Sequence, residues 1–134
     1  MIDEEKRVAL GEKSLLVSET DLNGIFRYIN DDLSLISGYS EAELIGKPHD
    51  IMRHPSMPRS VFQEMRSVVE GGRIWKGFVK NMTKSGDCFW VFMTVFPIDS
   101  VNGEGYLAVR TKASDEEIAR YEAKYERALI KETQ

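Results

Sequence analysis

The chain has 134 residues, enough for one domain with a substantial core but too few for two. Its formal charge of -4, with no basic cluster, argues against a nucleic-acid or anionic-membrane partner. The single cysteine, Cys88, excludes an intrachain disulfide framework and fits a reducing compartment. The acidic start does not resemble a signal peptide, and no run approaches the roughly 18 apolar residues that insert into a bilayer. We therefore expect a cytoplasmic protein, or the cytoplasmic domain of a membrane-anchored receptor.

The N-terminal part of the chain predicts a short helix and a hairpin. Residues 3–10 are charged and weakly helical. Residues 14–18 and 25–29 are apolar enough for two strands, and the segment 21–24 between them contains Asn-Gly turn chemistry.

Several short helices are expected next. Asn30 is followed by two acids, which suit the start of a helix. Ser40 and Glu43 form a capping box. Pro58 fits the first position of a helix that runs to about Glu70 and ends at two glycines.

The second half predicts three strands, at about 74–83, 88–97 and 105–111, joined by polar turns into an antiparallel meander. A capping box at Ser114 then opens a helix that runs nearly to the end. We expect an α+β fold, with one antiparallel sheet and helices on one face. The organisation is a cap segment at 1–13, a domain at 14–112 and an exit helix at 113–134.

Two faces of the predicted sheet carry different side chains. Trp75 and Asn81 are separated by an even number of residues, so they share one face, where an indole and an amide could hold a flat heteroaromatic ligand. The opposite face carries Phe78, Trp90 and Phe92, which the N-terminal segment or a second copy of the domain could cover. Aromatic residues of the last helix form a seam that could begin a coiled coil or pack on the domain itself.

Six motifs follow one another between about residues 20 and 111: Tyr28-Ile29-Asn30-Asp31, Ser37-Gly38-Tyr39, Leu44-Ile45-Gly46-Lys47-Pro48-His49, Met52-Arg53-His54-Pro55, Trp75-Lys76-Gly77 and Lys80-Asn81. With the order of the elements, they resemble a PAS sensor domain of the aerotaxis-receptor subgroup. The resemblance implies a five-stranded antiparallel sheet with short helices on one face and flanking terminal helices. Members of that subgroup bind FAD without a covalent bond and report redox or oxygen status to a chemotaxis module.

The resemblance also implies a set of cofactor-binding residues. Asn81 matches the asparagine that reads the polar edge of the flavin ring, and Trp75 matches a tryptophan that lines the pocket. Arg53 and His54 match a pair needed to hold FAD, and Asn30 matches the asparagine that closes the second strand. A primary amide can both donate to and accept from the ring, an aromatic wall supplies stacking, and a guanidinium suits pyrophosphate.

Each of these residues also has a plainer interpretation. Trp75 could be ordinary core, and Asn81 could bond to backbone alone. Arg53 could be a surface residue paired with Glu64 or Asp50, and His54 could simply shape its loop.

The chain departs from the family pattern at three positions. Ser56 stands where the family usually has an aspartate, which shortens and neutralises a side chain near the cofactor site. Val91 replaces the second asparagine of the photosensor relatives. Cys88 begins a strand, whereas the reactive cysteine of those relatives lies in the central helices, so we do not expect covalent photochemistry.

The sequence thus predicts a sensor of redox state or oxygen that binds FAD and is not an enzyme. Expected partners are a second copy, bound through the outer sheet face and the terminal helices, and a chemoreceptor or kinase signalling module. Two alternatives stay open: a cofactor-free PAS dimerisation module filled by its own side chains, and a PAS domain that senses a metabolite carboxylate through Arg53 and His54. No catalytic triad, metal-ligand spacing or phosphate loop is present in the sequence.

Overall fold

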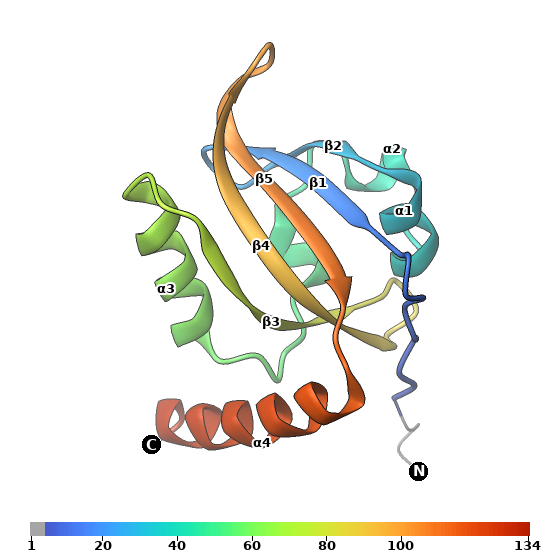
Figure 1. The fold of residues 1–134 in the computed structure, drawn as a ribbon, viewed down its shortest axis with the longest axis vertical. Coiled ribbons are helices and arrows are strands. Elements are labelled where there is room, and N and C mark those ends of the chain that lie inside the picture. Colours follow the sequence, from blue (N-terminus) through green and yellow to red (C-terminus); the bar gives the residue numbers. More distant parts are fainter. Residues whose placement is uncertain (1–4) are drawn as a thin grey trace.

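A computed structural model describes residues 5–134 of the chain. The sheet has five antiparallel strands in the order β2-β1-β5-β4-β3 (Figure 1). The elements in chain order are β1 (Leu16–Asp21), β2 (Phe26–Ile29), α1 (Asp31–Ser37), α2 (Glu41–Leu44), the 3-10 helix η1 (His49–Met52), α3 (Arg59–Glu70), β3 (Trp75–Met82), β4 (Cys88–Ser100), β5 (Gly103–Lys112) and α4 (Asp115–Glu132). The predicted α+β class and the meander of the last three strands are therefore confirmed.

The helix predicted over residues 3–10 is wrong for residues 5–10, the part that lies within the described chain. This segment runs beside the start of β4, where Arg7 forms a parallel bridge with Cys88. The Cys88 N–H donates to the Lys6 carbonyl at 2.8 Å. A helix of so few residues is unstable in isolation, and pairing with the sheet satisfies the same backbone groups.

The helix starts follow the predicted capping chemistry. Asn30 caps α1, and reciprocal capping boxes at Ser40 and Ser114 begin α2 and α4. Pro58 is the N-cap of α3 rather than its first residue, and it makes no side-chain cap. The start of α3 is capped instead by Glu132, whose carboxylate accepts the N–H groups of Arg59 and Ser60 at 2.9 and 3.1 Å. The C-terminal helix therefore completes α3.

The inner face of the sheet is the face that carries Trp75, Val79 and Asn81, and α3 packs against it. Opposite them in the ladder lie the inward residues of β4, among them Phe89, Val91 and Val95. Buried side chains of the helices, including Leu33, Leu44, Met52 and Val69, complete the core. The period of two along β3 and β4 thus sorts these side chains as the sequence predicted.

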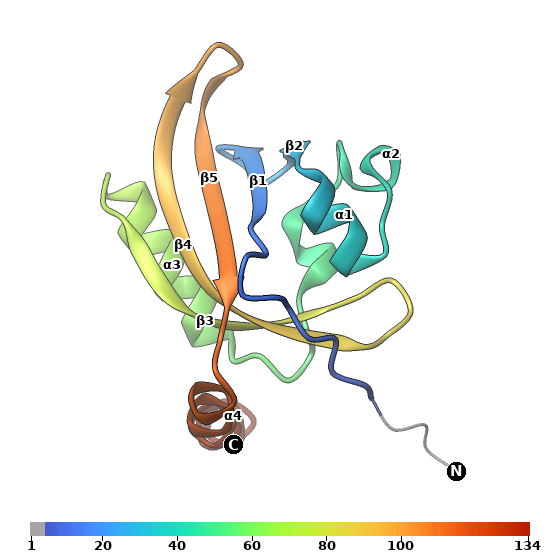
Figure 2. The same ribbon diagram turned by 45° about the vertical axis from the view of Figure 1, so that its right-hand side comes forward.

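The outer face of β3 and β4 is covered by α4, the chain's own C-terminal helix, which crosses one end of the sheet (Figure 2). Tyr121 packs on Phe78 with ring centroids 4.5 Å apart, and Tyr125 stacks on Trp90 at 6.1 Å. The Tyr125 hydroxyl donates to the Phe78 carbonyl at 2.6 Å. The aromatic seam therefore packs on the domain itself, which was one of the two interpretations that the sequence left open.

Candidate functional site

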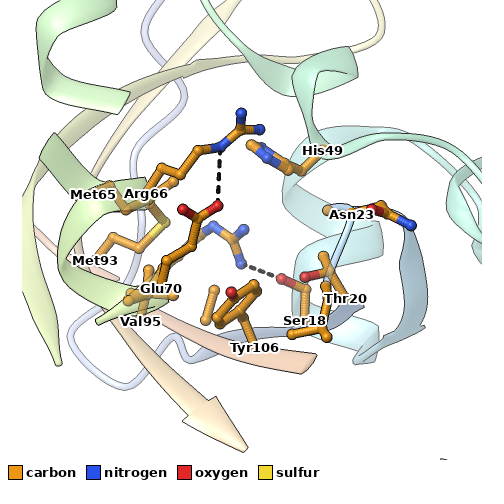
Figure 3. Close-up of a pocket in the computed structure, with 15 residues that line it drawn as sticks. Ser18, Thr20, Asn23, His49, Met65, Arg66, Glu70, Met93, Val95 and Tyr106 are labelled. Carbon is orange, nitrogen blue, oxygen red and sulfur yellow. Dashed lines mark hydrogen bonds and ion pairs between the residues drawn. The ribbon is translucent and has the colours of Figure 1, made fainter. Parts of the chain in front are cut away.

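A cavity of about 620 Å³, the space at its open mouth included, lies between the inner face of the sheet and α3. Its wall is apolar on the side of α3 and β4, where Met65, Met93 and Val95 lie, and polar on the side of β1, where Ser18 and Thr20 lie (Figure 3). The side chains of its floor and of its mouth give the cavity its chemistry.

The floor of the cavity carries a buried arginine. Arg110 extends from β5, is 4% exposed, and donates from Nη1 to the Ser18 hydroxyl at 3.0 Å. Its Nε is buried and has no partner among the described residues. Burial lowers the pKa of Arg110 to about 10, so the guanidinium stays charged at neutral pH.

The mouth of the cavity is lined by polar residues of α3, η1 and the β1–β2 turn, with Arg66, Glu70, His49 and Asn23 among them (Figure 3). Arg66 and Glu70 lie one helical turn apart and form an ion pair at 3.9 Å. Burial lowers the pKa of His49, Asp50 opposes that shift, and the charges of Arg110, Arg66 and Arg53 lower it further. The charges of these three arginines thus add to the effect of burial and disfavour a positive charge on this imidazole.

Trp75 and Asn81 are both buried on the inner face of β3, as the sequence predicted, but neither is among the residues that line this cavity. The Trp75 indole lies over Gly77, where a Cβ would approach the ring to 2.5 Å, so this position requires glycine. The Asn81 amide is 7% exposed, and its Nδ2 has no hydrogen-bond partner within residues 5–134. A buried amide without a partner is uncommon and marks Asn81 as a residue with spare donor capacity.

Arg53 lies beside Asn81, because the two residues form an antiparallel backbone bridge. Its guanidinium carbon lies 4.7 Å from the centroid of the Phe62 ring. Arg53 is thus anchored to the start of α3 by a cation-π contact. The structure brings these two predicted site residues together.

His54 is directed away from the cavity, toward the N-terminal segment. It is 8% exposed, its Nδ1 accepts the Ser56 N–H at 3.0 Å, and its Nε2 donates to the Glu5 carboxylate. Burial alone would raise the pKa of Glu5, but hydrogen bonds and charges from His54 and Lys80 bring it below its ordinary value. Ser56 lines a separate hollow between β3, β4 and α4, so this departure from the family pattern does not lie on the inner cavity.

Asn30 has no spare polar group. Its Oδ1 accepts the N–H groups of Val17 and Leu33 at 3.0 and 3.1 Å, and its Nδ2 donates to the Leu15 carbonyl at 2.7 Å. The side chain therefore ties β1 to the start of α1. Of the five predicted site residues, the structure places Asn81, Arg53 and Trp75 on the inner side and uses Asn30 and His54 for internal hydrogen bonds.

Arg110 and Ser18 were missed by the sequence reasoning. The signal was present, because Tyr106, Ala108 and Arg110 alternate along β5 and all three line the cavity. An arginine at an inward position of a central strand, paired in the ladder with Leu16 and Met93 rather than with an acid, is the pattern that would have revealed it. Cys88 lies outside the cavity lining, and burial, with a smaller contribution from Glu5, raises the pKa of its thiol.

Neither a metal-binding cluster nor a membrane-spanning helix is found within residues 5–134. No group of three or more His, Cys, Asp or Glu side chains in this part of the chain is arranged to hold a metal ion. None of its helices has both the length and the apolar character needed to cross a membrane.

A family model described as the PAS fold matches residues 26–110, from the start of β2 to near the end of β5. The chain belongs to the PAS family. This PAS domain is also 38% identical over 122 residues to the aerotaxis receptor of Escherichia coli K12, a match that covers 90% of this chain and 24% of the receptor. The nitrogen fixation regulatory protein of Klebsiella pneumoniae is 27% identical over 105 residues, which are 77% of this chain and 21% of that protein. The PAS domain therefore spans less than a quarter of the length of these relatives.

Solved structures agree with this PAS assignment. The PAS domain of a Colwellia psychrerythraea protein matches with a TM-score of 0.66 and 26% identity, over 74% of this chain and 86% of that one. A light-oxygen-voltage domain studied with a flavin analogue matches with a TM-score of 0.65 over 89% and 84% of the two chains. At 20% identity that second match supports the fold alone. The molecule is a PAS sensory domain, related in sequence to a receptor and to a regulatory protein.

Proposed function

We propose that this PAS domain is a cytoplasmic flavin sensor that binds FAD on the inner face of its sheet. It reports redox state or oxygen to a chemotaxis or other signalling module, and it is a sensor rather than an enzyme. The observation that carries this proposal is the Nδ2 of Asn81, a buried amide donor that has no hydrogen-bond partner in residues 5–134 and lies on the face where a ligand would lie. The similarity to an aerotaxis receptor supports it.

The inner face fits the chemistry of a flavin. A flavin ring is flat, with apolar flanks and one edge rich in carbonyl and imide groups, and Asn81 offers an unused amide to such an edge. Met65, Met93 and Val95 provide apolar wall, and the buried guanidinium of Arg110 provides a further donor. A bound flavin would supply the reversible uptake of electrons and protons that the protein groups themselves lack.

We assign the predicted residues to two roles. Asn81 holds the polar edge of the ring, Trp75 closes the apolar side, and Arg53 remains the candidate for the cofactor's phosphates. Asn30 and His54 have a structural role instead, because their polar atoms already have partners. Asn30 bonds to Leu15, Val17 and Leu33. His54 bonds to Glu5 and Ser56.

The route from the inner face to the C-terminal helix is short. Asn81 and Phe78 lie on the same strand, one facing inward and the other packed against Tyr121 of α4. The helix α3 lines the cavity, and its first N–H groups are capped by Glu132 of α4. A redox signal passes along this route only if the oxidised and reduced cofactor bind two arrangements of the domain with different affinity. A homodimer through the outer face stays a prediction, and it would have to form around α4.

The test is flavin binding by the purified chain. We expect native mass spectrometry and the absorption spectrum to show FAD, either as isolated or after incubation with FAD. Asn81→Ala should weaken FAD binding about tenfold or more, since the loss of one buried hydrogen bond to a ligand costs about 1.5 kcal/mol. The matched control is Asn102→Ala, which removes an exposed amide in the β4–β5 turn and should leave the affinity unchanged.

The alternatives predict other outcomes. A protein that stays colourless after incubation with FAD would remove the flavin proposal and favour a cofactor-free module. A small carboxylate found in the native mass spectrum, with no flavin, would favour the metabolite sensor.

A further inference from the structure

Arg110 is a buried arginine with no acidic partner among the residues that the structure describes. Among the described residues its guanidinium has one hydrogen-bond partner, Ser18, although an arginine carries five N–H donors. No carboxylate of residues 5–134 lies within salt-bridge distance of it. Its Nε is buried without a partner, and the side chain lines the floor of the inner cavity.

Arg27 shows how the same fold treats an arginine with a structural role. Its Nε donates to the Glu19 carboxylate at 2.6 Å, and its Nη atoms donate to the carbonyls of Asn102, Gly103 and Glu104. Arg27 therefore has a counter-charge and four acceptors, and it holds the β4–β5 hairpin. Arg110 is more deeply buried and has neither, although an unpaired buried charge is costly. This difference between Arg27 and Arg110 indicates that Arg110 interacts with a ligand that binds in the cavity.

Arg110 carries a positive charge at neutral pH. Burial leaves its pKa at about 10, so the group is protonated at neutral pH. The effect of its charge extends to His49 at the mouth, whose pKa it helps to lower. The floor of the cavity thus presents a permanent positive charge with unused donors in a region of low dielectric, where such a charge acts strongly.

We infer that Arg110 sets the redox preference of the site, by providing the counter-charge for the more negative, reduced form of the bound flavin. This inference rests on the proposed flavin function. Reduction by two electrons and one proton, taken from a donor such as a reduced nicotinamide, leaves the flavin one unit more negative than before. The guanidinium balances that charge, so the second proton that reduced flavin otherwise takes up stays in solvent. A positive group beside the flavin ring is a recognised means of tuning its potential.

The test compares midpoint potentials of the FAD-loaded protein by spectroelectrochemistry. Arg110→Gln should reduce the ratio of affinities for reduced and oxidised flavin at least tenfold, which lowers the two-electron potential by about 30 mV or more. Arg110→Lys keeps the charge and should restore most of that loss. The matched control is Arg127→Gln, which removes an exposed arginine of α4 outside the cavity lining, where distance and solvent screening should keep the change below about threefold.

A second measurement needs no variant, in case Arg110→Gln does not fold. The potential of the wild-type protein should fall by only about 30 mV per pH unit even between about pH 5 and 6, where reduced flavin in water takes up two protons; this is the slope for two electrons with one proton. Twice that slope would show uptake of two protons and would overturn the inference. An FAD-loaded Arg110→Gln protein with an unchanged potential would overturn it alone. A wild-type protein that takes up no flavin would overturn both this inference and the proposed function.

Discussion

The inner and outer faces of this PAS domain differ in how their buried polar groups are satisfied. On the outer face, the Tyr125 hydroxyl of α4 donates to the Phe78 carbonyl, and the Glu132 carboxylate of the same helix caps the start of α3. On the inner face, the Asn81 amide and the Arg110 guanidinium keep buried N–H groups that no described residue accepts. Trp90, on the outer side, also has an unpaired indole N–H, but its ring carries no charge and stacks on Tyr125.

This comparison separates packing from recognition. Buried polar groups are expensive unless they are paired, so a fold under selection for stability alone would pair or remove them. On the outer face, the Tyr125 hydroxyl and the Glu132 carboxylate follow that rule and join α4 to the rest of the domain, and the neutral Trp90 N–H is the exception among the described residues. The inner face breaks it at an amide and a cation that share one side of the sheet, which is why we place the ligand there.

The largest expected effect on stability comes from a substitution on the outer face. Trp90→Ala should lower the free energy of unfolding by about 3–5 kcal/mol, because it removes a buried aromatic side chain between β4 and Tyr125. Trp90→Phe is the control and should cost less than about 1.5 kcal/mol, since most of the volume is kept. Urea denaturation measures both. A cost below about 1 kcal/mol for Trp90→Ala would mean that α4 does not seal this face.

The second prediction sharpens the comparison with two asparagines. Asn30→Ala should cost about 2 kcal/mol, because it removes the cap of α1 and leaves the Leu15 carbonyl and the Val17 N–H without partners. Asn81→Ala should cost less than about 1 kcal/mol in the ligand-free protein, since its Nδ2 has no partner to lose. Urea denaturation without flavin tests the pair. Equal losses of stability would contradict the distinction between Asn30, whose amide holds β1 to α1, and Asn81, whose amide is available to a ligand.

The smallest effect is expected from Tyr125→Phe, about 1 kcal/mol for one buried hydrogen bond. Burial, with smaller effects of Tyr121 and Glu64, raises the pKa of the Tyr125 hydroxyl above its ordinary value of 10. The stability that this neutral hydroxyl provides is therefore complete below pH 10 and is lost as the pH rises above it. Unfolding measured between pH 8 and 11 should show a steeper loss for the wild type than for the variant. Parallel curves would contradict the buried hydrogen bond.

Features of the site that depend on nearby residues could be predicted from the sequence, whereas features that depend on distant residues could not. The parity of β3 correctly placed Trp75 and Asn81 on one buried face. His54 could not be placed in this way, because its ring is oriented by Glu5, which is 49 residues away in the chain. Arg110 was overlooked because its importance lies in a missing counter-charge, which is a property of every element packed around it.

The amino-acid sequence by itself determined the strands, the helix caps, the alternation of faces and the PAS family, since these depend on residues a few positions apart or on ordered motifs. Only the tertiary structure decided that α4 covers the outer face and that a guanidinium with no acidic partner among the described residues forms the floor of the cavity. Those features come from contacts such as Tyr125 with Phe78, 47 residues apart, and Arg110 with Ser18, 92 residues apart. Local chemistry carries no information on which distant groups will meet, or on which will be left without a partner when the chain closes.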